Sequence, residues 1–426
     1  MSRCQPATAY RWVFQSLRAG NRLFAIASIA LLALLTGECQ VRAELRTPLI
    51  TQKTSPAQPM NPKAALERLF TTDPITAEWF APTFLAQVPV SQIQQIIASL
   101  SKELGQYRGV ETEGEQYRIV FERGTIPTKI ALNEQGQISG LLFQSPRLKG
   151  MSLEDSVAAF QALPGQVSLL VLEGETERAA LNANQPLAVG STFKLAVLIA
   201  LRQQIQAGQH TWSEVVSLQS DRKSLPSGFL HTWAEGSLLT VESLAALMIS
   251  QSDNTATDHL IHLVGREAIE QISPRNRPFL MTREAFILKS HNNGELRQQY
   301  QSGDTARRRQ LLSVVAQKPL PGVSEFEAGP IGPEIEWFFT TQELCQLMAT
   351  VKDLPLMRIN PGVATAQDWK QVAFKGGSEP GVLNLTTWLQ AKNGRQYCVS
   401  ATWNDKKTLD EAHFFTLYAT VLESLK

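Results

Sequence analysis

The sequence has 426 residues, of which 43% are hydrophobic, 8% aromatic and 19% charged. This composition is ordinary for a globular protein with enough apolar residues for two cores, and it excludes a disordered chain and a coiled coil. Lysine and arginine number 40 and aspartate and glutamate 39, so the formal net charge is +1. That balance implies no charge-driven binding to nucleic acid or to a membrane surface.

The first 43 residues differ from the rest, since they carry five arginines and one acid, Glu38. Their apolar run from Leu23 to Leu35 has 13 residues, which is short for a membrane-spanning helix and typical of a secretory signal. The small-residue pattern ending at Ala43 predicts a signal peptide over 1–43, removed near Glu44. The alternative is an uncleaved membrane anchor, and both predict a periplasmic or secreted protein. From residue 44 onward, 35 basic and 38 acidic residues give a net charge of −3.

Residues 44–60 are rich in proline, serine and threonine, a composition that predicts a linker. The pattern of residues 61–149 predicts a small α+β domain. Apolar spacing predicts short helices broken at Pro74 and Pro82 and an amphipathic helix over 93–104. Alternating patterns then predict strands over 117–121, 130–132 and 138–143. On topology alone, this order resembles the cone-shaped fold of ketosteroid isomerase and nuclear transport factor (NTF2-like) relatives. No titratable pair stands out in it, so we interpret it as a binding or packing module.

Residues 150–426 predict a second α+β domain. One end of this segment predicts a helix over 152–162, a buried strand over 166–172 and its hairpin partner over 177–181. The other end predicts strands over 382–389 and 397–403 and a closing helix over 411–425. We therefore expect one antiparallel sheet built from both ends of the segment, flanked by helices, with an all-helical region between them.

The first chemical motif is Ser191 and Lys194, three residues apart at the start of an apolar stretch over 195–201. The stretch is hydrophobic on all sides and predicts a buried helix. The spacing puts both side chains on one face, with the serine where backbone N–H groups and the helix dipole favour an oxyanion. A half-buried lysine has a lowered pKa and can accept a proton. We predict Ser191 as the nucleophile and Lys194 as its base.

The spacing alone does not single out Ser191, because Ser99 with Lys102 and Ser220 with Lys223 share it. Ser99 lies inside an amphipathic helix, and Ser220 lies in a polar loop with no apolar helix after it. Only Ser191 begins a buried helix, which is why we assign the role to it.

The second motif is Ser252-Asp253-Asn254, between helices predicted over 240–250 and 255–264. The Ser252 hydroxyl can relay a proton from the base to a leaving group, and the Asn254 amide can hold a substrate carbonyl. The triplet is equally suited to capping the following helix, and the two roles can coexist.

The third motif is Lys375-Gly376-Gly377-Ser378, which begins a strand. The glycines let a substrate approach the backbone, and Lys375 places a positive charge beside it. The N–H groups of Ser191 and Ser378 are the predicted oxyanion hole, and Asn254, Lys375, Gly377 and Ser378 the predicted substrate-binding residues. The alternative for the third motif is a hairpin entry with an exposed lysine.

The motifs occur in this order, 61 and 123 residues apart. Residues 151–426 thereby resemble the serine β-lactamase and penicillin-binding-protein superfamily, closest to the class A β-lactamases, with their Ser-x-x-Lys, Ser-Asp-Asn and Lys-Thr-Gly signatures. With a signal, a small isomerase-like domain and a class A-like domain, the chain resembles two-domain proteins related to a clavulanic-acid-pathway hydrolase, over nearly the whole of its predicted mature part.

Two departures from that family are visible. Gly376 stands where the family has a hydroxyl residue, so a contact to a β-lactam carboxylate is missing unless Ser378 supplies it. The Glu-x-x-Leu-Asn loop, which activates the deacylating water in the family, does not occur in residues 265–370. We interpret the nearest acids, Glu284 and Glu295, as solvated charges. Glu379 precedes a Leu-Asn pair, at the wrong spacing and on the wrong side of the third motif.

We therefore predict that the protein is an exported serine hydrolase that forms an acyl-serine intermediate with a β-lactam, ester or amide. We also predict that it turns β-lactams over poorly. One alternative is a protein that binds penicillin or a cell-wall ligand without efficient turnover. Another is a peptidoglycan DD-peptidase acting on a cell-wall peptide. The predicted partner is a small-molecule substrate in each case, and the natural substrate and the oligomeric state stay open.

Two features remain. Cys345 and Cys398 either form a disulfide or are two buried thiols; two cysteines alone cannot build a closed zinc site, and no metal or other cofactor is expected. Residues 290–333, which include Arg307-Arg308-Arg309, are a possible lid over the site. We interpret the three arginines as a solvated helix face.

Overall fold

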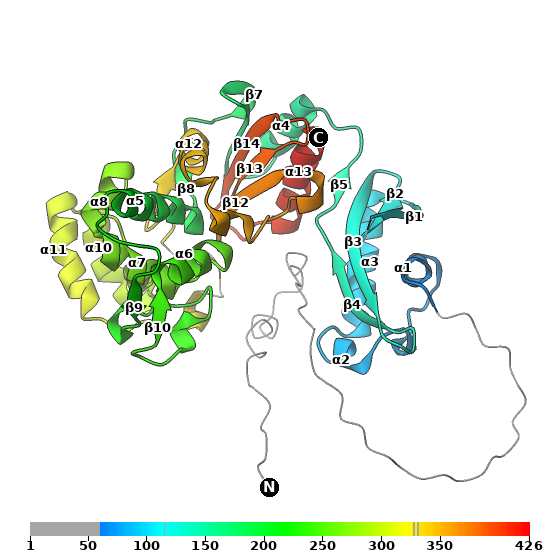
Figure 1. The fold of residues 1–426 in the computed structure, drawn as a ribbon, viewed down its shortest axis with the longest axis horizontal. Helices are drawn as coiled ribbons and strands as arrows, with labels where there is room; N and C mark the ends of the chain where they lie inside the picture. The colour runs from blue at the N-terminus through cyan, green and yellow to red at the C-terminus, as the bar shows by residue number, and fades with distance from the viewer. Residues whose placement is uncertain (1–59, 115, 327–328, 330–331) are drawn as a thin grey trace, which may run out of the picture. The chain divides into compact units, whose positions relative to one another are not determined.

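The computed structural model describes residues 60–426 except 115, 327–328 and 330–331. The predicted signal peptide over 1–43, its cleavage near Glu44 and the linker up to residue 59 lie outside the described residues. Within the described part of the chain, no helix is both long and apolar enough to cross a membrane. The chain divides into two compact units, one up to Lys149 and one from Gly150 (Figure 1).

The first unit places its helices before its strands, as predicted. The helical elements are α1 (Pro62–Thr71), the 3₁₀ turn η2 (Ala77–Trp79), α2 (Pro82–Leu85) and α3 (Val90–Leu104). The strands are β1 (Tyr107–Glu113), β2 (Gln116–Phe121), β3 (Gly124–Leu132), β4 (Ile138–Phe143) and the short β5 (Arg147–Leu148). The sheet has the antiparallel order β1-β2-β3-β4, and β5 pairs with β3. Apolar residues of α1 and α3 and of one sheet face form its core.

The helical segments of this unit are interrupted near Pro74 and Pro82, as predicted: α1 ends at Thr71, and η2 ends at Trp79 before Pro82 begins α2. Proline suits the first helical turn because its missing N–H would have no partner there. One local prediction differs from the structure. Strand β1 was not predicted, since only Val110 is buried in it and charged residues occupy much of the strand. Edge strands with so little buried surface carry a weak alternating signal.

The second unit contains one five-stranded antiparallel sheet in the order β12-β13-β14-β6-β7. Its strands are β6 (Gln166–Glu173), β7 (Thr176–Leu181), β12 (Gln371–Glu379), β13 (Val382–Gln390) and β14 (Gln396–Asn404). This confirms the prediction of a sheet built from both ends of the segment and flanked by helices. Strand β12, which carries the third motif, is one of the two edge strands of this sheet (Figure 1).

Helices make up most of the segment between β7 and β12. They are α5 (Lys194–Gln206), α6 (Val241–Ser250), α7 (Asn254–Val264), α8 (Arg266–Ile272), α9 (Thr282–Lys289), α10 (Gly294–Ser302), α11 (Thr305–Ala316) and α12 (Thr341–Val351). Short strands connect distant parts: β8 (Leu187–Ala188) pairs with β11 (Phe338–Phe339), and β9 (Val215–Ser217) pairs with β10 (Leu238–Thr240). Helices α4 (Leu153–Gln161) and α13 (Glu411–Ser424) pack together through Phe160 and Phe414, whose ring centroids are 5.3 Å apart.

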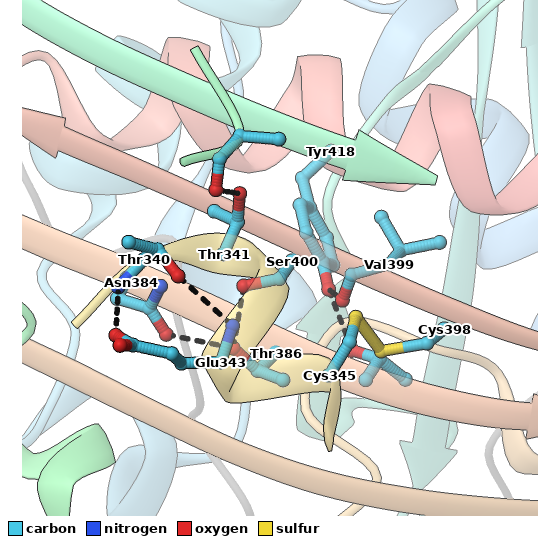
Figure 2. The surroundings of a disulfide bond; sticks show 12 residues. Thr340, Thr341, Glu343, Cys345, Asn384, Thr386, Cys398, Val399, Ser400 and Tyr418 are labelled. Atoms are coloured by element: carbon cyan, nitrogen blue, oxygen red, sulfur yellow. Dashed lines mark hydrogen bonds between the residues drawn. A yellow bond between two sulfur atoms is a disulfide. The ribbon is translucent and has the colours of Figure 1, made fainter. Parts of the chain in front are cut away.

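The two faces of the sheet are covered by different helices. Phe414 of α13 stacks on Trp403 of β14, with ring centroids 5.9 Å apart, which places α13 on one face. Cys398 points to the opposite face, since neighbouring residues of a strand alternate, and it forms a disulfide with Cys345 of α12. Figure 2 shows this bond beside Thr386 and Ser400, whose hydroxyls are 2.9 Å apart. The cysteine pair is therefore bridged.

The disulfide closes a chain segment with a sequence separation of 53 residues. Replacing both cysteines, Cys345→Ala with Cys398→Ala, is expected to lower the free energy of unfolding by about 2–4 kcal/mol, because the cross-link restricts the unfolded chain. Urea unfolding of both proteins measures this, with reduced parent protein as a control that should match the variant. An unchanged midpoint in urea would contradict the prediction.

Candidate active site

Ser191 lies in a 3₁₀ turn, η3 (Gly190–Phe193), that leads directly into α5 at Lys194. A 3₁₀ turn has three residues per turn, so residues i and i+3 lie one above the other, and the two predicted catalytic residues share one side. Residues 194–201 are all buried, which confirms the predicted buried helix. Gly190 enters the turn with a φ of +48°, a conformation that glycine adopts without strain.

Lys194 is completely buried and joins the first motif to the second. Its ammonium donates to the Ser252 carbonyl at 2.6 Å, to Asn254 Oδ1 at 2.7 Å and to Ser252 Oγ at 3.1 Å. These contacts use all three donors of an ammonium group. If the Lys194 ammonium loses one proton, its nitrogen gains a lone pair. Only in that neutral form can Lys194 accept a proton from a hydroxyl such as that of Ser191.

The surroundings of Lys194 favour that loss. Burial lowers its pKa from 10.5 to about 7, and the carboxylates of Asp253, Asp258 and Glu379 oppose this shift by raising it. A large fraction of the amine is therefore neutral near pH 7. This is the electrostatic condition for a lysine general base.

Ser252 connects both lysines of the site. Its hydroxyl oxygen lies 3.1 Å from Lys194 Nζ and 3.1 Å from Lys375 Nζ. Its φ is +55°, and among the described residues only Asn182 is another non-glycine residue with positive φ. Such a backbone conformation costs free energy and needs surrounding contacts to hold it. The Ser227 hydroxyl supplies one of them, since it donates to the Ser252 carbonyl at 2.6 Å.

The rest of the second motif is engaged in structural contacts. Asp253 caps α7 by accepting from the N–H of Ala256 at 2.8 Å, as expected for a helix cap, and it also accepts from the N–H groups of Phe229 and Leu230. Asn254 accepts from Lys194, and its Nδ2 donates to the Leu225 carbonyl at 3.0 Å. Substrate binding by Asn254 stays a prediction, and it would have to use the remaining lone pair and N–H of the amide.

Lys375 is buried, so it is not the exposed lysine of a hairpin entry. Burial and the nearby Lys194 lower its pKa well below 10.5. On β12 it pairs in register with Thr386, and Gly377 pairs with Asn384. Because alternate strand residues share a face, Lys375, Gly377 and Glu379 lie on one face of β12.

Gly377 is the point where the third motif contacts η3, the turn that carries Ser191. A Cβ atom at this position would lie 2.2 Å from the Val189 carbonyl oxygen, 2.4 Å from Ser191 N and 2.7 Å from Thr192 N. On the other side of this contact, a Cβ on Gly190 would lie 3.2 Å from Ser378 N. The backbones of Ser191 and Ser378, the two predicted oxyanion donors, are therefore neighbours.

Gly377→Ala is expected to push β12 away from η3, because the new methyl group would collide with backbone atoms that cannot rotate away. A displacement of about 1 Å in a catalytic site can cost on the order of 100-fold in rate. We expect acylation by a penicillin to fall by about that factor, measured by stopped-flow labelling. Gly322→Ala is the matched control, since its Cβ would meet only Ser324 Oγ, at 3.6 Å. Equal rates for both variants would contradict the expectation.

In the family that the sequence resembles, a hydroxyl residue occupies the position of Gly376. In this structure the Ser378 hydroxyl does not take its place. The Ser378 hydroxyl donates to Glu411 Oε1 of α13 at 2.7 Å. Since Ser378 and Lys375 are three apart on a strand, their side chains leave on opposite faces. A Cβ on Gly376 would lie 2.8 Å from Cζ of Phe374, so an aromatic ring borders this position.

One of the two acids interpreted as solvated is not. Glu284 is 8% exposed and forms two hydrogen bonds with Arg266, of 2.8 and 3.0 Å. It also accepts from the N–H of Met281 at the start of α9, so it is a structural ion pair and helix cap. For Glu284 the sequence-based interpretation failed because its partner, Arg266, lies in another helix. Arg307 and Arg309 are exposed, in agreement with the predicted solvated helix face, and Arg309 also contacts Glu267 and Glu270.

Sequence reasoning missed a second charged cluster beside the motifs. It comprises Lys289 at the end of α9, Glu336 just before β11 and Glu379 directly after the third motif. Only the position of Glu379 next to Ser378 hinted at it, because the other two residues are distant in sequence. Among the described residues, no group of three or more His, Cys, Asp and Glu side chains could hold a metal ion.

Similarity to known proteins lies in the second unit of the chain. Residues 152–283, which contain the first two motifs, match the family described as "Beta-lactamase enzyme family". No curated protein sequence matches the chain.

Solved structures with a similar fold include a β-lactamase from Sphaerobacter thermophilus, with 21% identity over 64% of this chain and 96% of that one and a TM-score of 0.45. A class A β-lactamase representative from Bacteroides cellulosilyticus has 17% identity over 64% of this chain and 95% of that one, with a TM-score of 0.44. The protein PBP-A has 15% identity over 64% of this chain and 94% of that one, with a TM-score of 0.44.

Proposed function

We propose that the protein is an exported serine hydrolase that acts through an acyl-Ser191 intermediate. Ser191 Oγ attacks an ester or amide carbonyl, Lys194 accepts its proton, and Ser252 passes a proton to the leaving group. The N–H groups of Ser191 and Ser378 stabilise the oxyanion, while Asn254, Lys375 and Gly377 hold the substrate.

One observation carries this proposal: three segments distant in sequence converge on the Ser191 turn. Lys194 and Lys375 both contact Ser252 Oγ at 3.1 Å, and Gly377 abuts the Ser191 backbone. A structural ion pair would join opposite charges, whereas here two lysines share one hydroxyl in a buried site. Such a placement costs stability and is typical of a functional site.

The family match over residues 152–283 supports the proposed substrate class. It comprises β-lactams and the esters or amides that react with a serine in the same way. We propose that β-lactam turnover is poor. The Glu-x-x-Leu-Asn loop is missing from the sequence, and the Ser378 hydroxyl that could replace a hydroxyl at position 376 is engaged by Glu411.

The location and the first unit complete the proposal. The arginine-bearing apolar leader supports export to the periplasm or beyond, and a disulfide between Cys345 and Cys398 is compatible with an oxidising compartment. We propose the first unit, with its NTF2-like order of helices and strands, as a binding or packing module.

The test is covalent labelling of residues 44–426, which include every residue that the structure describes. Incubation with a fluorescent penicillin is expected to add the mass of one penicillin to the chain, on Ser191. Absence of any adduct with penicillins and with activated esters would contradict the proposal.

A binding protein without efficient turnover is the second candidate, favoured by the engaged Ser378 hydroxyl. The lifetime of the acyl-enzyme with a cephalosporin separates the two, because a hydrolase releases the label in seconds and a trapped protein in hours. Release of D-alanine from a stem peptide would instead favour a DD-peptidase.

A further inference from the structure

The charged cluster of Lys289, Glu336 and Glu379 has an excess of buried negative charge. The Lys289 ammonium contacts one carboxylate oxygen of each glutamate. The Lys289 and Glu336 side chains are 4% and 0% exposed, and the Glu379 side chain is 21% exposed. One buried carboxylate and one partly exposed carboxylate therefore face a single cation. Glu336 is shielded from water, whereas Glu379 is accessible to it.

The second carboxylate oxygen of Glu336 indicates how the two glutamates are protonated. Glu336 Oε2 is buried and has no donor among the described residues. Glu379 lies within hydrogen-bonding reach of Glu336, but two ionised carboxylates cannot donate to each other. One shared proton between them resolves the conflict. Burial and the Glu379 charge raise the pKa of Glu336 to about 8, whereas Lys289 keeps the pKa of Glu379 low, so Glu379 is the ionised partner near neutral pH.

The backbone places this carboxyl pair beside η3, the turn that carries Ser191. The N–H of Val189 donates to the Trp337 carbonyl at 3.1 Å, and Phe193 stacks on Trp337 with ring centroids 3.8 Å apart. Glu336 directly precedes this contact. On the other side, Gly377 and Ser378 abut Gly190, and Glu379 follows them on the strand face that carries Lys375. The two glutamates thus leave from the two segments that flank Gly190 and Ser191.

We propose that Glu379, supported by Glu336 and Lys289, is the base that activates water for hydrolysis of acyl-Ser191. This inference rests on the proposed function and assigns the group that completes it. The partly exposed carboxylate of Glu379 can meet water, whereas Glu336 and Lys289 are positioning residues that hold it and set its charge. Whatever turnover the enzyme has, with β-lactams or esters, then depends on this carboxylate.

The step balances as an ester hydrolysis. Glu379 takes one proton from water as the water oxygen bonds to the acyl carbon, and the carbonyl electrons move to the oxyanion. The oxyanion then re-forms the carbonyl and the bond from the acyl carbon to Ser191 Oγ breaks. Oγ takes up the proton that Glu379 accepted, which leaves a free acid product and an unmodified serine.

The experiment compares Glu379→Gln with Glu336→Gln in residues 44–426. Glu379→Gln removes the base but leaves Lys289 paired with Glu336. We expect deacylation to slow by at least about 100-fold, within the range for loss of a general base. Acylation by the same fluorescent penicillin should not slow, because the Glu379 charge raises the pKa of Lys194 and its loss favours the neutral amine. Glu336→Gln keeps Glu379 ionised and paired, so we expect a much smaller effect. Partial recovery of deacylation in Glu379→Asp would support a carboxylate requirement.

Two controls separate a lost base from a distorted site. Hydroxylamine attacks esters without needing a base, so it should discharge the acyl-enzymes of the parent and of Glu379→Gln at similar rates. Glu325→Gln is the second control. It alters a carboxylate outside the cluster, which accepts a hydrogen bond from Ser290 Oγ at 2.8 Å, and it should leave deacylation unchanged. Thermal unfolding shows whether each variant is folded.

The outcomes distinguish this inference from the proposed function. Normal deacylation in folded Glu379→Gln would overturn the assignment of the base, as would equal losses in Glu379→Gln and Glu336→Gln, which indicate a structural cluster. Failure of the parent protein to form any acyl-enzyme would instead overturn the proposed function itself.

Discussion

Ser191→Ala is expected to abolish covalent labelling by a fluorescent penicillin and to lower ester hydrolysis by at least about 1,000-fold. The variant lacks the only atom proposed to bond the acyl group, and loss of a nucleophile removes the covalent route entirely. Intact-protein mass spectrometry measures the label, and a chromogenic ester measures hydrolysis. The fold should persist, because Ser191 is only partly buried and the substitution removes a single oxygen atom.

The chain itself offers matched controls for Ser191. Ser99→Ala and Ser220→Ala alter the other two serines that precede a lysine by three residues, and both serines are exposed. Both variants should label as the parent does. Labelling that persists in Ser191→Ala, or that is lost in Ser220→Ala, would contradict the assignment.

Lys194→Arg is expected to lower the acylation rate by about 1,000-fold, although it keeps a positive charge in the site. An arginine stays protonated in proteins and cannot accept a proton, so the variant removes the base while keeping a donor. Loss of a general base costs on the order of 100- to 10,000-fold. Stopped-flow labelling measures the rate, and circular dichroism verifies that the variant is folded.

The pH dependence of acylation tests the same group in the parent protein. The proposed base is the neutral amine of Lys194, whose fraction grows as pH rises through its pKa of about 7. Acylation should therefore rise about tenfold per pH unit well below pH 7 and level off above it. A rate that falls between pH 6 and pH 8, or that keeps rising towards pH 10, would show that Lys194 is not the base.

The motifs were accessible from the sequence because each is a short contiguous run with a distinctive local setting. Ser191 stood out from Ser99 and Ser220 because a wholly apolar stretch follows it, and that stretch is the buried part of α5. The sheet strands were predictable for the same reason, since β13 and β14 are almost entirely buried. Strand β1 was missed because it buries too little surface to show alternation.

The partners of charged side chains were not accessible from the sequence. Glu284 looked like a solvated acid, yet it is buried against Arg266 of another helix. Whether Cys345 and Cys398 form a bond also depended on how α12 lies on β14. Pairing energies arise between elements that are distant in the chain, so a local pattern carries no signal for them.

The sequence was enough to predict that helices precede strands in the first unit, that both ends of the second unit build one sheet, and that three motifs include a candidate nucleophile. These properties follow from apolar periodicity and from residue types at close spacing. The tertiary structure alone decided which atoms meet: two lysines on one Ser252 hydroxyl, Gly377 against the Ser191 backbone, and Glu336 with Glu379 around Lys289. The physical reason is that burial and proximity set protonation and geometry, and both arise only when distant segments pack together.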